Sequence, residues 1–403
     1  MVNLRWILAL VSAGVACSYP DLVAPDAPQT PDGADHPPPI APSNGVGLDD
    51  LSLVDAEIAI TGEATFDTDT GQVAGSIVRA PVVGIDAGIA FRVTHDGLGV
   101  FTFHRLTVAT PGTIRFVGTR AAVFVVETVA TIEGTVDGSG GCAMTTTCAG
   151  PGGGTGASRD AVATGCGAGS SGIEGASVDD AGGGGAGAGA VGAPGGGGTN
   201  PPASVRGAGG GSCLQPTGQP LRGGSGGGAG SSRTEARGGG GGGGFQLTAL
   251  EQIDVSGTIT MAGGGGAGGP GTVGTASPNA GAGGGGGSGG TILIEAPTVL
   301  LGATTILAAN GGGGGGGGES FTTGLPGARG NASATPALGG IPAAAEGQGG
   351  NGGARDAAAT SGTQPTSNSN GGGGGGGVGV IFLRADVPTL AGTISPKPTT
   401  AAL

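Results

Sequence analysis

One stretch of sequence recurs along the chain, and it constrains the fold more than any other feature. Its copies lie at residues 121–138, 245–263, 291–311 and 380–396. Each copy contains short runs of Val, Ile, Thr and Phe, which are the residue types that fit a pleated, half-buried strand surface. Each also has a Thr followed by Val or Ile near its end, and the first three copies then run into glycine. We therefore interpret each copy as a pair of short β-strands.

Apolar residues within a copy recur at every second position, as Phe124 and Val126 do. A period of two places these side chains on one face of a strand. A unit of two short strands cannot bury that face alone, whereas stacked units cover one another and build a continuous core. The sequence therefore predicts an all-β fold, a right-handed parallel β-helix, with Leu247, Ile294 and Leu383 in one core. The alternative is a set of unrelated strands in a β-sandwich or barrel.

Glycine tracts separate the copies and account for most of the 102 glycines among the 403 residues. They lie within 142–243, 263–290 and 311–377. Because glycine loses more backbone entropy on ordering than other residues, we do not expect the tracts to be the source of stability. Each tract follows the same corner of a copy, so all should project from one side of the stack. Two alternatives remain: the tracts present an interaction face, or they pack together as polyglycine helices.

The N-terminal residues 1–17 have the pattern of a signal peptide. A positive Arg5 precedes an apolar run that is too short to span a bilayer as a stable helix. The run ends in Ala-Gly-Val-Ala-Cys, which resembles the lipobox of bacterial lipoproteins, with Gly14 where that family usually has Leu. The resemblance implies that Cys17 carries a lipid and that the protein lies at the outer membrane or cell surface. The alternative is ordinary cleavage and secretion.

The remainder of the chain divides by composition. Residues 18–47 are rich in proline and are predicted to form an extended tether. Residues 48–98 are expected to form a β-rich N-terminal cap or the first turns, because an exposed end of a stack needs cover. Residues 99–396 are predicted to form the β-helix with its glycine-rich insertions, and 397–403 a short tail.

Four cysteines, Cys142, Cys148, Cys166 and Cys213, lie within the first glycine-rich insertion. Their number is even, and they contain no CxxC pair and have no histidine nearby, so they predict two disulfides formed in an oxidising compartment. The expected pairs are Cys142 with Cys148 and Cys166 with Cys213, although three connectivities are open. Zinc binding is the alternative.

Charge argues against one class of partner. The formal net charge is −13, and Lys397 is the only lysine. No basic patch is available for a phosphate backbone, so we expect no nucleic-acid partner. The glycine tracts also lack the Gly-Lys-Ser/Thr sequence of a phosphate-binding loop.

Few residues suggest chemistry. The acidic run 67–71 resembles a calcium loop, but its glycine comes one position early and no acidic residue closes it, so we expect a polar turn. His95 and His104 have no nameable nucleophile beside them and are expected to be structural or solvated. Alignment of the copies places Glu295 level with Thr248 and, after a one-residue shift, with Arg384. No ladder of acidic residues results, so we assign no catalytic, cofactor-binding or metal-binding residue and expect no cofactor.

Strand copies that alternate with glycine tracts are similar to the glycine-rich β-helical surface proteins and lipoproteins of Gram-negative bacteria, over residues 101–394. The tracts also resemble, more weakly, the PGRS domain of the PE-PGRS family, whose helical head is missing here. The first resemblance implies a surface-anchored, adhesion-type structural protein that is not an enzyme. Its expected partners are a membrane, through the lipid, and extracellular matrix or polysaccharide. The alternative is a carbohydrate-binding or carbohydrate-cleaving β-helix protein.

Overall fold

The described part of the chain is all-β. The computed structural model describes residues 40–47, 54–141, 149–173, 180–198, 206–231, 236–271, 280–319, 321–365 and 369–403. Within these ranges every regular element is a β-strand and no helix occurs, which confirms the predicted all-β class. The predicted signal peptide and the first part of the tether lie outside the described residues.

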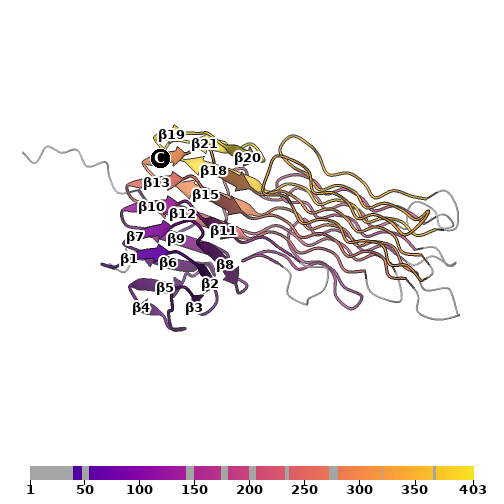
Figure 1. The fold of residues 1–403 in the computed structure, drawn as a ribbon, viewed down its shortest axis with the longest axis horizontal. Coiled ribbons are helices and arrows are strands. Elements are labelled where there is room, and N and C mark those ends of the chain that lie inside the picture. Colours follow the sequence, from indigo (N-terminus) through magenta and orange to yellow (C-terminus); the bar gives the residue numbers. More distant parts are fainter. Residues whose placement is uncertain are drawn as a thin grey trace, which may run out of the picture. The chain divides into compact units, whose positions relative to one another are not determined.

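The strands form three sheets, here called sheets A, B and C (Figure 1). Sheet A contains β1 (Glu57–Ile60), β7 (Arg105–Val108), β10 (Val129–Ile132), β13 (Gln252–Val255), β16 (Thr298–Leu301) and β19 (Val387–Thr389). Sheet B contains β2 (Glu63–Asp67), β3 (Val73–Gly75), β8 (Thr113–Val117), β11 (Thr135–Asp137), β14 (Thr258–Thr260), β17 (Ile306–Ala308) and β20 (Thr393–Ser395). Sheet C contains β4 (Gly84–Asp86), β5 (Ile89–Val93), β6 (Gly99–Phe103), β9 (Ala122–Val126), β12 (Gly244–Ala249), β15 (Thr291–Glu295), β18 (Val380–Arg384) and β21 (Thr399–Ala401).

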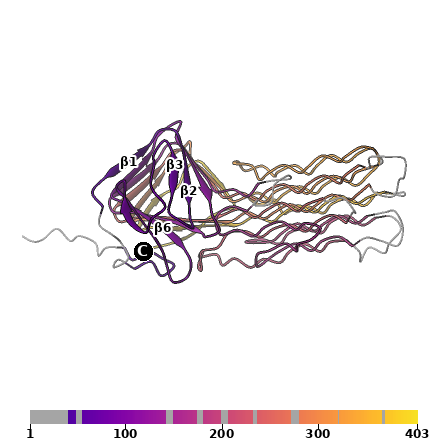
Figure 2. The same cartoon turned by 90° about the horizontal axis from the view of Figure 1, so that it is seen from below.

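From β6 onward the chain visits the sheets in the fixed order C, A, B and then returns to C. Pairings among strands β6 to β21 are all parallel and join each strand to its counterpart one turn earlier or later. Each repeated copy therefore contributes three strands, and the expectation of two per copy is wrong. The third strand was missed because it has only three residues, as in β11, β14 and β17. Figure 2 looks along the stack and shows the sheets around one interior.

Inward-facing side chains of all three sheets form one core. Leu247, Ile294 and Leu383 occupy equivalent places in successive turns, pair in register and are fully buried in this core, as predicted. The N-terminal turns fill it with aromatic rings: the Phe124 ring lies 5.1 Å from that of Phe66 and has four more phenylalanine neighbours. The later turns use aliphatic side chains, so the core changes composition along the stack.

One part of the copy alignment is wrong by a residue. The Thr305–Ile306 step was placed level with the Thr-Ile steps of the other copies, but Ile306 pairs with Thr258 and Thr393. Leu307 is the residue that points inward there, and it is fully buried. Sheet C has a register of its own, in which Glu295 pairs directly with both Thr248 and Arg384.

Residues 54–98 form both the first strands of the stack and a cap over its end, which were the two roles considered for this part of the chain. Strands β1 and β2 are parallel members of sheets A and B and belong to the stack. Strands β3, β4 and β5 pair antiparallel and cover one end of sheets B and C. Arg79 organises this cap: its guanidinium is fully buried and donates hydrogen bonds to five backbone carbonyls. Burial lowers the pKa of Arg79, and the charge of Asp86 opposes that shift.

Both ends of the predicted layout need correction. The tether was expected to reach residue 47, but Ile40 and Val46 are buried and residues 40–46 pack on sheet C, so that part of the prediction is wrong. The predicted tail at 397–403 is also wrong, because β21 within it completes sheet C beside β18. Prolines at 388, 396 and 398 lie in or beside the last strands, where a missing amide is tolerated best.

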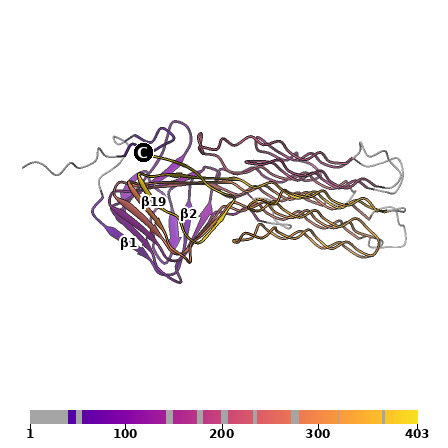
Figure 3. The same ribbon diagram turned by 90° about the horizontal axis from the view of Figure 1, so that it is seen from above.

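The three glycine-rich insertions all connect sheet B to sheet C, at 138–243, 261–290 and 309–379. In Figures 1 and 3 they run as long, adjacent extended segments from one side of the strand stack. The common corner agrees with the prediction that they leave from one side. We call these segments the glycine bundle.

Hydrogen bonds within the glycine bundle repeat every three residues. In segment 180–190, three successive amides donate to three different neighbouring segments, and the next three return to the same neighbours in the same order. The donor and acceptor pairs are Gly182 with Gly196, Gly183 with Gly283, Gly184 with Ser170, Gly185 with Ala193, Ala186 with Gly286 and Gly187 with Gly167. Three residues per turn is the repeat of the polyproline II helix, which makes no internal hydrogen bonds.

The carbonyls of the same segment accept from three further segments. Gly207, Gly374 and Gly228 donate to the carbonyls of residues 182, 183 and 184. The segment therefore has six neighbours and satisfies its buried backbone groups without a sheet. A side chain would not fit: a Cβ on Gly183 would lie 2.2 Å from the carbonyl oxygen of Gly228. The described tracts therefore pack against one another, as the second of the two alternatives for them predicted.

Candidate functional site

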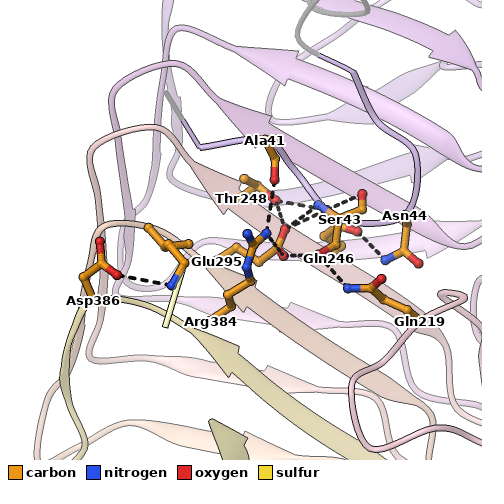
Figure 4. A network of polar contacts seen from close by, with 10 residues as sticks. Ala41, Ser43, Asn44, Gln219, Gln246, Thr248, Glu295, Arg384 and Asp386 are labelled. Atoms are coloured by element: carbon orange, nitrogen blue, oxygen red, sulfur yellow. Dashed lines mark hydrogen bonds and ion pairs between the residues drawn. The ribbon is translucent and has the colours of Figure 1, made fainter. Parts of the chain in front are cut away.

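Residues 40–46, here called the strap, lie across the outer face of sheet C (Figure 4). At one end, the carbonyl of Ala41 accepts a hydrogen bond from Arg384 of β18 at 3.2 Å. At the other end, Val46 packs against Val100 of β6 and Val123 of β9. The strap therefore contacts early and late turns of the stack, and it lies within the C-terminal part of the segment predicted as a tether.

The centre of the strap is held by the carboxylate of Glu295, whose side chain is fully buried. The carboxylate accepts hydrogen bonds from the amide of Ser43 at 3.0 Å and from the Ser43 hydroxyl. It also accepts from Gln246 Nε2 at 3.1 Å and Thr248 Oγ1 at 3.0 Å, and it pairs with Arg384 Nη1 at 3.4 Å. Figure 4 shows these groups converging on the Glu295 carboxylate of β15 from β12, from β18 and from the strap.

Neighbouring amides extend this network. Asn44 Nδ2 donates to Gln246 Oε1 at 2.9 Å, and Asn44 Oδ1 accepts from the amide of Leu221 at 2.8 Å. Gln219 Nε2 donates to the hydroxyl of Ser43 at 2.8 Å. The strap is therefore bonded to sheet C on one side and to the loop that contains residues 219 and 221 on the other.

Burial changes the energetic meaning of the Glu295–Arg384 pair. An ion pair between exposed side chains contributes little to stability. Glu295 is 0% exposed and Arg384 26% exposed, so removal of one partner leaves a desolvated charge or unpaired donors. The Glu295 network therefore attaches the strap to sheet C. Removing one of its members should destabilise the fold, although the network stabilises it little more than an apolar contact of similar size would.

A groove lies where the strap, the cap and the glycine bundle meet; we call it the junction groove. It has a volume of about 660 Å³ and is lined by residues 44–45, 96–98, 119–121, 152 and 219–222. It lies beside the connection from β8 to β9, at residues 118–121, which carries no glycine insertion. Two smaller hollows of about 300 and 280 Å³ adjoin it and share Thr119, Gly152 and Arg222 with it.

The charged residues that line the junction groove are Arg120, Arg222 and Asp96. Arg120 Nε pairs with Asp69 Oδ1 at 3.3 Å. Asp69 also accepts hydrogen bonds from Thr119, which fixes the corner. The groove is thus polar, with a surplus of guanidinium groups and a glycine-rich wall.

The residues considered for chemistry do not come together. Asp67 accepts hydrogen bonds from the amides of Asp69 and Thr70, and Gly71 adopts a φ of 75°, so this run is the expected polar turn. His104 Nδ1 lies 3.2 Å from Glu127 Oε2 and is partly exposed. The described residues hold no cluster of three or more His, Cys, Asp or Glu side chains placed to bind a metal ion.

The cysteine prediction is confirmed where the structure describes it. Cys166 and Cys213 are disulfide-bonded, with their Cα atoms 5.9 Å apart. This bond links two segments of the glycine bundle, one within residues 149–173 and the other within residues 206–231. Cys17, Cys142 and Cys148 lie outside the described residues.

The strap and the groove were missed at the level of the sequence. Ser43 and Asn44 stand in a proline-rich stretch that has the composition of a linker. The outward positions of β12 carry the polar residues Gln246 and Thr248, which the structure shows to be fully buried. Polar side chains on the outer face of a central strand are ordinarily solvated, so nothing marked these two as partners of a segment 200 positions earlier.

Comparisons with family models, with curated proteins and with solved structures find no significant match. Across the described ranges no helix is long and apolar enough to cross a membrane.

Proposed function

We propose that residues 54–403 form a right-handed parallel β-helix that presents a bundle of polyglycine helices. We further propose that the protein is a surface-anchored, non-catalytic display protein, held at a membrane by a lipid on Cys17. Right-handed connections between parallel strands are by far the commoner kind, which supports that hand for the helix. The glycine resemblance and the lipobox-like sequence support the location.

The observation that carries this proposal is the packing of all described tracts into one hydrogen-bonded bundle on one side of the strand stack. A bundle whose buried residues are mostly glycine has few side chains with which to perform chemistry, but it is a stiff spacer. Every segment is satisfied by its neighbours rather than by water, so the bundle holds its far end at a fixed distance from the stack.

The strap supports the anchoring half of the proposal. A pull on the tether reaches the folded body at residue 40, and the strap distributes it to β18, β15, β12, β9 and β6 through the contacts of Ala41, Ser43 and Val46. A load shared by several turns is harder to relieve by peeling one end of a stack, which is the weak point of repeat folds.

The anchor is tested by labelling expressing cells with radioactive palmitate. The unaltered chain should incorporate label, Cys17→Ala should lose it, and Cys142→Ala should retain it. Unchanged incorporation by Cys17→Ala would refute the lipid anchor. Display is tested separately, by protease digestion of intact cells: release of glycine-bundle fragments is expected, and their full protection would refute surface exposure.

A second function, carbohydrate binding, is favoured by the junction groove. Glycoside cleavage ordinarily uses two carboxyl groups that flank the bond, whereas the 660 Å³ groove is lined by one, Asp96. We therefore propose binding rather than cleavage for this groove.

A further inference from the structure

The junction groove has a charge balance opposite to that of the chain. The chain as a whole contains 28 acidic and 15 basic residues. The groove is lined by two arginines, Arg120 and Arg222, and one acidic residue, Asp96. Asp69 already balances Arg120, so among the described residues that line the groove the unpaired guanidinium group is that of Arg222. On an acidic protein this cation attracts anionic ligands to the groove, while the remaining surface repels them.

Both arginines have nitrogens free for a ligand. Arg120 uses Nε to pair with Asp69, and its two terminal nitrogens have no hydrogen-bond partner among the described residues. Arg222 is exposed and forms no ion pair or hydrogen bond with the described part of the chain. The planar fork of a guanidinium group matches the two oxygens of a carboxylate, so this pair favours carboxylate-bearing ligands.

The shape of the site indicates a polymer. The groove continues into two further hollows through Thr119, Gly152 and Arg222, so Arg222 lies at the meeting point of two of them. Glycine backbone forms most of the wall of the 280 Å³ hollow. The groove itself mixes polar residues with the apolar Leu98, Ala121, Pro220 and Leu221. An elongated polar groove of this kind suits a chain of hydroxyl and carboxylate groups better than a compact apolar molecule.

We propose that the junction groove binds a segment of an acidic polysaccharide. A uronate carboxylate pairs with Arg222 and Arg120, while sugar hydroxyls donate to Asp96 and to the free carbonyl oxygen of Gln219. This inference deepens the carbohydrate-binding function proposed above. It is independent of the lipid anchor, because it is measured on the purified full chain.

Isothermal titration with oligogalacturonate, a linear uronate oligomer, tests the proposal. The unaltered chain should bind it more tightly than a neutral galactan oligomer of equal length, and more tightly than oligoglutamate of equal charge. Arg222→Ala should weaken binding by roughly tenfold. Asp96→Asn should tighten it by about threefold, because it removes a repelling charge and keeps a polar side chain.

Arg206→Ala is the matched control, since Arg206 is an exposed arginine of the glycine bundle outside the groove, and it should bind as the unaltered chain does. Equal binding of oligoglutamate would overturn the glycan assignment and leave only a general anion site. Equal losses in Arg222→Ala and Arg206→Ala, or no binding of oligogalacturonate, would overturn the site itself. Because Asp96→Asn is expected to gain affinity, its outcome cannot be mistaken for unfolding.

Discussion

The strand stack and the glycine bundle solve the same problem in opposite ways. Both bury extended backbone, and both satisfy its amides and carbonyls with neighbouring segments. In the stack each segment has two hydrogen-bonded neighbours, and side chains fill the interior. In the bundle segment 180–190 has six, and the space that side chains would occupy is filled by other backbones. The stack is stabilised by apolar burial, and the bundle by contact and hydrogen bonding between backbones.

The glycine tracts were not expected to be a source of stability, and their packing shows how they can contribute to it. The entropy cost of ordering glycine is real, but it is met by a packing that only glycine permits. Dispersion contacts between closely packed backbones and fully paired buried polar groups offset that cost. Occasional alanines such as Ala186 are fully buried in the bundle, so it tolerates a methyl group only at particular sites.

The largest expected effect is in the stack. Phe124→Ala removes the ring that contacts five other phenylalanines, and it should lower the free energy of unfolding by about 4 kcal/mol. Val117→Ala, at a half-exposed position of β8, should cost far less. Denaturant unfolding followed by hydrogen exchange measures both. If the bundle kept its protection after the stack had opened, the two regions would be separate folding units.

In the glycine bundle, one added methyl group should lower the free energy of unfolding nearly as much as removal of a large core side chain does in the stack. Gly285→Ala places a Cβ 2.1 Å from the carbonyl oxygen of Gly184, so the neighbouring segment must move and the expected cost is about 3 kcal/mol.

Gly211→Ala is the control, because a Cβ there meets nothing within 4 Å. It should be neutral or slightly stabilising, since alanine restricts the unfolded chain. Thermal unfolding of the two variants decides the matter: similar midpoints would show that the bundle is loosely packed.

The strap connects the tether to the stack, and its loss should have an intermediate effect. Glu295→Gln replaces an acceptor of several hydrogen bonds by a group that also donates, and it leaves Arg384 without its charge partner, so we expect a loss of about 2 kcal/mol. Limited proteolysis should cut the strap faster in this variant. Glu251→Gln, at an exposed position, should behave as the unaltered chain does. Equal cleavage rates would mean that the strap is held by its apolar contacts alone.

The smallest effect is calorimetric. Exposure of apolar surface raises the heat capacity on unfolding, whereas exposure of polar surface lowers it. Because the bundle buries mainly peptide groups, the heat-capacity change per residue should fall below the usual value of about 12 cal/mol/K. Differential scanning calorimetry measures it. A value at or above that figure would indicate that the glycine segments do not unfold with the stack.

Much of the stack could be predicted because its determinants are local. Alternation of apolar residues identified the inward face of β12, β15 and β18. A register based on the Thr-Val/Ile step brought Glu295 to Thr248 and, only after a one-residue shift, to Arg384. The three-residue strands of sheet B gave too short a signal, which explains both the two-strand expectation and the misplaced Thr305–Ile306 step. The even number of cysteines predicted disulfides but left three connectivities open, and the structure shows the expected Cys166–Cys213 pair.

The amino-acid sequence by itself determined which side chains form the core and where the glycine segments leave it, because a period of two and a change in composition are written in consecutive residues. Only the tertiary structure decided how those segments pack, how the strap is bonded and where the junction groove opens. Glycine has no side chain to distinguish one neighbour from another, so the choice of six partners depends on the positions at which the stack starts and ends each segment. The strap and the groove likewise join residues that are far apart in the chain, and no local pattern records such contacts.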